Sequence, residues 1–175
     1  MQQLYITQER LKLFRANPEW KKNVEKACKC KIAITPDDTI EISSQDAIAE
    51  FTAKNILYAF GRGFEIEVAL TLTNPDIYFK LIDLGLIESK PERIKQIKAR
   101  VIGLGGKTKR YIEEVSQAKI SIYGGTVGII GNITQESEAE TAINTIIDGG
   151  THRLAYIRME AMHRKNKADL VSAKF

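Results

Sequence analysis

A repeat within the chain constrains its fold more than any other feature. Residues 107–122 align without a gap on residues 19–34, at an offset of 88 positions. The identical pairs are Lys109 and Lys21, Glu113 and Glu25, Lys119 and Lys31, Ile120 and Ile32, and Ile122 and Ile34. Each copy needs about 75 to 85 residues, a size that can fold on its own. The chain of 175 residues is therefore predicted to form two similar modules, residues 1–72 and residues 73–175.

Both copies are predicted to share the element order β-α-α-β-β-α. Turn residues and the spacing of apolar residues place the boundaries of these elements. In the second copy, strands are predicted at residues 77–84, 119–123 and 126–130, and helices at residues 91–102, 107–117 and 138–147. In the first copy, strands are predicted at residues 4–6, 31–34 and 39–42, and helices at residues 8–14, 19–29, 45–60 and 65–72. This order predicts an α+β fold, with a three-stranded antiparallel sheet packed by helices in each module.

Four residues between the two consecutive helices of the second copy form a glycine loop, Gly103-Leu104-Gly105-Gly106. The second helix starts directly after this loop, and the start of a helix offers free backbone N–H groups and a positive dipole end to a phosphate. Glycine lets a nucleic-acid backbone approach closely, since no Cβ stands in the way. Lys107, Lys109 and Arg110 add positive charge on the first turn.

This arrangement resembles a KH domain, whose GxxG loop clamps about four nucleotides of a single strand. The resemblance implies two tandem type I KH modules, with bases lying between the helices and strand 119–123, where Ile112 also faces the groove. The residues expected to contact RNA are Arg100, Ile102, Gly103, Leu104, Gly105, Gly106, Lys107, Lys109, Arg110, Ile120, Ile122, Arg153 and Arg158. A P-loop is excluded, because Val101 stands where its first glycine is required.

The first copy departs from the pattern at its loop. At the same offset the residues are Arg15-Ala16-Asn17-Pro18. Asn17 can cap the following helix and Pro18 suits its first position, so the fold is retained. Pro18 has no N–H for a phosphate, and side chains crowd the approach. The first module is therefore predicted to fold like the second without clamping RNA in the usual way.

The charge of the chain is segregated. The formal net charge is only +4, but residues 90–110 carry eight basic residues against the single acid Glu92. Residues 152–167 carry five basic residues against Glu160, so the rest of the chain is acidic. Such a distribution is expected when one surface meets a polyanion. Helix 152–167 is expected either to follow RNA through Arg153, Arg158, Arg164 and Lys165, or to brace the module through an apolar stripe of Leu154, Ile157 and Ala161.

Three further stretches, residues 58–64, 100–110 and 118–131, together resemble an archaeal member of the partner-of-Nob-one family of small-subunit ribosome assembly factors. This resemblance implies binding near the 3′ end of the small-subunit ribosomal RNA. It also implies cooperation with the Nob one endonuclease and contact with the alpha subunit of translation initiation factor two. The function expected is non-catalytic RNA binding in ribosomal RNA maturation, without a cofactor.

Other classes of protein fit less well. A protein-interaction scaffold that docks a nuclease or an initiation factor through the first module is the alternative. No constellation of His, Cys or paired carboxylates near the loop suggests an enzyme, and Cys28 and Cys30 lack a second pair of metal ligands. No apolar run is long enough to cross a membrane, and residues 1–5 lack the features of a signal peptide. A cytoplasmic location is therefore expected, and the protein is separately predicted to be a monomer.

Overall fold

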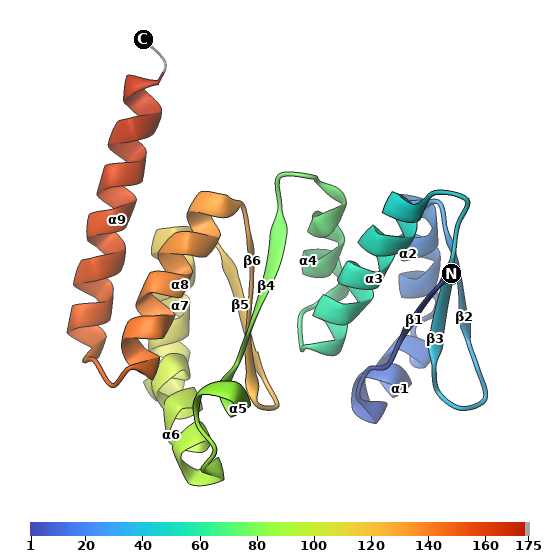
Figure 1. Ribbon diagram of the computed structural model, residues 1–175, viewed down its shortest axis with the longest axis horizontal. Helices are drawn as coiled ribbons and strands as arrows, with labels where there is room; N and C mark the ends of the chain where they lie inside the picture. Colours follow the sequence, from blue (N-terminus) through green and yellow to red (C-terminus); the bar gives the residue numbers. More distant parts are fainter. Residues whose placement is uncertain (174–175) are drawn as a thin grey trace. The chain divides into compact units, whose positions relative to one another are not determined.

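A computed structural model describes residues 1–173. The chain divides into two compact units, Met1–Phe79 and a second unit that begins at Lys80. This division falls inside strand β4 (Tyr78–Asp83), whereas the sequence placed it after Leu72. Each unit contains the predicted series of strand, two helices, two strands and helix (Figure 1).

The first unit has a three-stranded sheet whose strand order is β1-β3-β2. Its elements are β1 (Gln2–Leu4), α1 (Gln8–Ala16), α2 (Pro18–Cys28), β2 (Lys31–Ile34), β3 (Ile40–Ser43), α3 (Ala47–Gly61), α4 (Ile66–Leu70) and the 3-10 turn η1 (Thr71–Thr73). Strand β3 pairs antiparallel with both neighbours. Its inward residues Ile40 and Ile42 are fully buried, as are Leu11 of α1 and Ile56 of α3. The core of this unit therefore lies between the sheet and the helices.

The second unit has a sheet of order β4-β6-β5, in which β5 is an edge strand. Its other elements are α5 (Leu84–Ile87), α6 (Pro91–Ile102), the 3-10 turn η2 (Leu104–Gly106), α7 (Lys107–Ser116), β5 (Lys119–Tyr123), β6 (Thr126–Gly131), α8 (Ile133–Ile147) and α9 (His152–Ser172). Helices α7 and α8 pack on the sheet, α6 packs on α7 and α8, and α9 packs on the same two helices (Figure 1). None of the helices within residues 1–173 combines the length and apolar character needed to cross a bilayer.

One hydrogen bond recurs in both units at the repeat offset. The Ile32 N–H donates to Glu25 Oε1 over 2.8 Å, and the Ile120 N–H donates to Glu113 Oε1 over 2.8 Å. Both isoleucines lie on edge strands, whose outward N–H groups have no neighbouring strand to bond. The identical Glu and Ile pairs of the repeat thus connect the second helix of each unit to its edge strand.

Helix α9 packs through a different face from the one expected. Ala155 and Met159 are fully buried, whereas Leu154 and Ile157 are 38% and 50% exposed. The expectation that Leu154, Ile157 and Ala161 face inward is therefore wrong. Each residue turns a helix by about 100°. Assigning the stripe to positions one or two residues away therefore moves the predicted inner face to the other side of the helix.

Candidate nucleic-acid interface

The glycine loop has a backbone that few other residues adopt. Gly103, Gly105 and Gly106 have φ values of +75°, +58° and +77°. A positive φ is unfavourable for residues with a Cβ. The sequence Gly-x-Gly-Gly is therefore required by the path of the chain between α6 and α7.

The three glycines have different surroundings. A Cβ on Gly103 would lie 2.2 Å from Thr108 Oγ1, so this glycine is needed for close packing inside the loop. A Cβ on Gly105 would meet nothing within 4 Å, and one on Gly106 would meet only the Arg110 guanidinium at 3.8 Å. Gly105 and Gly106 thus keep a surface of the loop open to a ligand.

The start of α7 offers fewer free amides than the sequence predicts. The Gly106 N–H donates to Gly103 O over 3.0 Å, and the Lys107 N–H donates to Leu104 O. A helix leaves about four N–H groups unpaired at its start, and the 3-10 turn η2 engages two of these. The attraction for a phosphate consequently depends more on the side-chain charges beside the loop.

Those charges come from three residues of α7. The Arg110 guanidinium donates through Nη2 to Gly105 O over 2.8 Å, which holds the loop while its other N–H groups can meet a ligand. Lys109 Nζ lies 4.0 Å from Glu113 Oε1. Lys107 is exposed, and so is Leu104 at the tip of the loop, with 88% of its surface accessible.

Arg100 has a structural position that the sequence did not predict. Its guanidinium donates to Ile146 O in the last turn of α8 over 3.1 Å, and to Gly150 O in the connection that follows this helix. His152 Nε2 lies 2.8 Å from Arg100 O. The last carbonyls of a helix lack partners within the helix, and Arg100 bonds one of them, Ile146 O, in α8. These bonds engage the Arg100 guanidinium within its own unit, and RNA contact by Arg100 stays a prediction.

The expected apolar groove is largely closed. Ile112 is fully buried and Ile120 is 3% exposed, because both belong to the core formed with Val101 and Ile129. Ile120 therefore cannot contact a base, and the expectation for this residue is wrong. Ile122, two residues further along the same strand face, is half-buried, and Ile102 at the end of α6 is 37% exposed. Ile102, directly before the loop, and Ile122 on β5 thus keep part of their apolar surface accessible.

Helix α9 supports the first turn of α7 from behind. The Tyr156 hydroxyl donates to Thr108 Oγ1 over 3.3 Å, and the rings of Tyr156 and Tyr111 lie 4.4 Å apart. The Tyr111 hydroxyl donates to the Glu160 carboxylate, which raises the pKa of Tyr111. Bracing by α9 was one of the two roles left open by the sequence, but the aromatic pair that provides it was not recognised.

Replacing Tyr111 by phenylalanine tests this brace. We expect Tyr111→Phe to lower the free energy of unfolding by about 1 to 2 kcal/mol, because it removes a hydrogen bond to a charged acceptor. Urea denaturation followed by circular dichroism measures the change. Tyr78→Phe is the control, since Tyr78 is 48% exposed and its hydroxyl group is expected to contribute little. Equal stabilities of the two variants would contradict the brace.

The loop of the first unit forms contacts of its own in place of a glycine loop. Arg15 Nη2 forms an ion pair with Asp38 Oδ1 at 2.6 Å. The Asn17 side chain donates to Leu13 O and does not cap α2, so that part of the sequence prediction is wrong. Pro18 occupies the first position of α2, as predicted.

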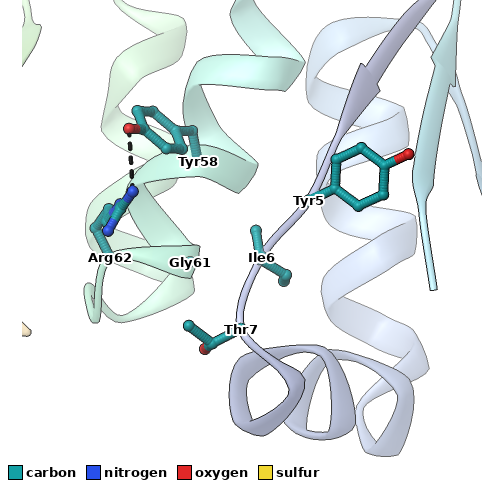
Figure 2. Close-up of a pocket in the computed structure, with 6 residues that line it drawn as sticks. All are labelled: Tyr5, Ile6, Thr7, Tyr58, Gly61 and Arg62. Atoms are coloured by element: carbon teal, nitrogen blue, oxygen red, sulfur yellow. Dashed lines mark hydrogen bonds between the residues drawn. The ribbon is translucent and has the colours of Figure 1, made fainter. Parts of the chain in front are cut away.

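The first unit also has a pocket of about 250 Å³ that the sequence did not indicate. Figure 2 shows Tyr5, Ile6 and Thr7 on one side, and Tyr58, Gly61 and Arg62 at the end of α3 on the other. Arg62 Nη2 donates to the Tyr58 hydroxyl over 3.4 Å. A Cβ on Gly61 would lie 2.5 Å from Ile6 Cγ2, so this glycine allows the end of α3 to approach the chain after β1.

No cluster of three or more His, Cys, Asp or Glu side chains suited to a metal ion occurs within residues 1–173. Cys28 and Cys30 are free thiols and both are buried. Burial, followed by the neighbouring Cys30, raises the pKa of the Cys28 thiol to about 11. The thiolate, which is the form that binds metals, is disfavoured there.

Comparison with known proteins places this fold in a family. The family model that matches residues 78–164 is described as a eukaryotic-type KH domain, KH-domain type I. A KH domain-containing protein of Methanocaldococcus jannaschii is 35% identical over 151 residues, which cover 84% of this chain and 66% of the relative. The RNA-binding protein PNO1 of Oryzias latipes is 30% identical over 122 residues, which cover 68% of this chain and 50% of the relative. The chain thus spans half to two thirds of the length of these relatives.

Two solved structures from Pyrococcus horikoshii OT3 are also similar. Dim2p has a TM-score of 0.82 and 35% identity, and the match covers 91% of this chain and 98% of Dim2p. A structure described as an a/eIF2alpha-aDim2p-rRNA complex has a TM-score of 0.85 and 34% identity, with 94% of each chain covered. The family resemblance noted from the sequence is therefore confirmed. With the type I KH match at the glycine loop and near-complete coverage of Dim2p, the chain belongs to the PNO1/Dim2 family of KH-domain proteins.

Proposed function

We propose that this protein binds single-stranded RNA through the loop Gly103–Gly106 and acts, without catalysis, in the maturation of small-subunit ribosomal RNA. The observation that carries the proposal is the open surface at Gly105 and Gly106 beside Lys107 and Arg110. Names of relatives support it, since they include RNA-binding protein PNO1 and pre-rRNA-processing protein pno1. In this proposal the protein acts in the cytoplasm.

The clamp we propose is narrower than the sequence suggested. Gly103 shapes the loop, while Leu104, Gly105, Gly106, Lys107, Lys109 and Arg110 contact the sugar-phosphate backbone, with bases against Ile102 and Ile122. KH modules read bases beside such a loop while the glycines admit the backbone. Arg100 and Ile120 are left out because both are engaged inside the unit.

Both units are proposed to be type I KH modules, with the recurring Glu to Ile hydrogen bond as support. In this proposal residues 1–72 form a module that keeps the scaffold and has lost the clamp. Residues 73–175 form the clamping module, with the basic helix α9 as its extension. The ion pair of Arg15 with Asp38 supports the loss of function in the first loop.

The partners we propose are RNA near the 3′ end of the small-subunit ribosomal RNA and the alpha subunit of translation initiation factor two. The description of the aDim2p complex, which includes a/eIF2alpha and rRNA, supports both. Cooperation with the Nob one endonuclease stays a prediction of the family resemblance, as does a monomeric state.

Salt dependence of RNA binding tests the clamp. Each phosphate contact adds about 0.7 to the slope of log affinity against log salt for a single strand. We expect Lys107→Gln to reduce the magnitude of this slope by about 0.7, the value of one phosphate contact. Fluorescence anisotropy with a labelled 3′-end ribosomal RNA oligonucleotide measures the slope. Arg100→Gln is the matched control: it should lower stability and leave the slope unchanged. The clamp is refuted if the full chain does not bind the RNA, or if only Arg100→Gln changes the slope.

A further inference from the structure

The outer face of α9 carries an apolar stripe that no element of its unit covers. Leu154 and Ile157 are 38% and 50% exposed, and Ala161 and Ala168 are exposed further along. Positions separated by three, four and seven residues lie on one face of a helix. The stripe is opposite to Ala155 and Met159, which bury the inner face against α7 and α8.

Basic side chains border this stripe on both sides. Arg153 and Arg164 lie along one edge, and Arg158 and Lys165 lie along the other, as the rotation of about 100° per residue requires. All four are exposed. Arg158 reaches Thr145 Oγ1 only at 3.4 Å. Glu160, the acid within this stretch, has its carboxylate engaged by the Tyr111 hydroxyl. The face is therefore apolar along its middle and positive at its rims.

We propose that this face binds an acidic amphipathic helix of another protein. A helix with apolar residues at the same spacing would cover the stripe, and Glu or Asp at its edges would pair with the four cations. The stripe from Leu154 to Ala168 corresponds to about 20 Å of helix, or roughly four turns of the partner. This site is separate from the glycine loop and does not depend on RNA binding there.

Two other occupants fit less well. RNA phosphates would pair with the arginines but gain nothing from Leu154 and Ile157, since single strands are usually held by aromatic stacking in addition to charge. A second copy of this chain, docked by the same face, would place basic rims against basic rims. Like charges across an interface suppress association. An acidic helix uses both the stripe and its rims.

Photo-crosslinking identifies the occupant. The full chain, with p-benzoylphenylalanine in place of Ile157, is irradiated in cells and the crosslinked segment is sequenced. We expect a segment of another protein with apolar residues at helical spacing and flanking acids. A crosslink to RNA, a crosslink to this chain or no crosslink at all overturns the proposal. The same substitution at Ile48 of α3, which is 75% exposed, controls for exposed apolar surface alone.

The crosslinked segment is then synthesised and titrated against variants of the full chain. We expect Ile157→Ser to weaken its binding about tenfold, and Arg153→Gln with Arg164→Gln to do the same, as for interface residues of intermediate weight. All three positions are exposed, so folding should not change. If Ile157→Ser has no effect, the face binds polyanions through charge alone and the proposal fails. Unchanged RNA binding by these variants would separate this site from the clamp.

Discussion

Replacing Gly105 and Gly106 together by aspartate is expected to lower the affinity of the protein for single-stranded RNA about 100-fold or more. The added side chains enter open space at the loop, where the backbone of the RNA is proposed to lie. Each carboxylate there repels a phosphate and also neutralises a nearby cation such as Lys107 or Arg110, so several favourable contacts are lost together. Fluorescence anisotropy at a fixed salt concentration measures the loss.

Asparagine at the same two positions is the matched control. Asn has the shape of Asp, tolerates a positive φ better than most residues, and carries no charge. The Asn variant is therefore expected to lose about tenfold in affinity, from steric crowding of the close approach. If Asp and Asn variants lose equal affinity, the loop does not act through phosphate charge. If neither loses affinity, RNA binds elsewhere on the molecule.

The parts of the fold that the sequence predicts best are those bounded by glycine, proline and clear turns. Helix α6 and strand β5 have the predicted limits, because Pro91, Gly103 and the Gly124-Gly125 turn mark them. Helix α8 begins at Ile133, five residues before the predicted start. Asn132 and Gln135 form a capping box there, a start signal that is already visible in the sequence. Helix α5 was hidden in an apolar run that favours a strand equally well.

For the site as well, features set by neighbouring residues could be predicted from the sequence, and features set by distant contacts could not. The glycine loop was recognisable because its conformation is dictated by neighbouring residues. Arg100 could not be assigned in this way, since its partners Ile146 O and Gly150 O lie 46 and 50 residues away. The packing face of α9 is also a tertiary property. It depends on Tyr156 meeting Thr108 and Tyr111, contacts that span more than 40 residues.

Among Gly→Ala substitutions in the loop, Gly103→Ala is expected to be the most destabilising. It should lower the free energy of unfolding by about 2 to 4 kcal/mol. The new Cβ would lie 2.2 Å from Thr108 Oγ1 and 2.7 Å from the Thr108 backbone nitrogen, at a φ of +75°. The strained φ and the contact with backbone both persist whatever rotamer Thr108 adopts. Urea denaturation followed by circular dichroism measures the loss.

Gly105→Ala separates the two contributions. Its φ is also positive, at +58°, but its Cβ would meet nothing within 4 Å. Its cost should therefore be near the 1 kcal/mol expected for the conformation alone. Adding Thr108→Ala to Gly103→Ala removes the hydroxyl and leaves the backbone nitrogen in place, so stability should recover only in part. Full recovery would mean that the clash with the Thr108 side chain causes the whole cost, with no contribution from φ or the backbone nitrogen. Equal costs at Gly103 and Gly105 would mean that close packing in the loop contributes nothing.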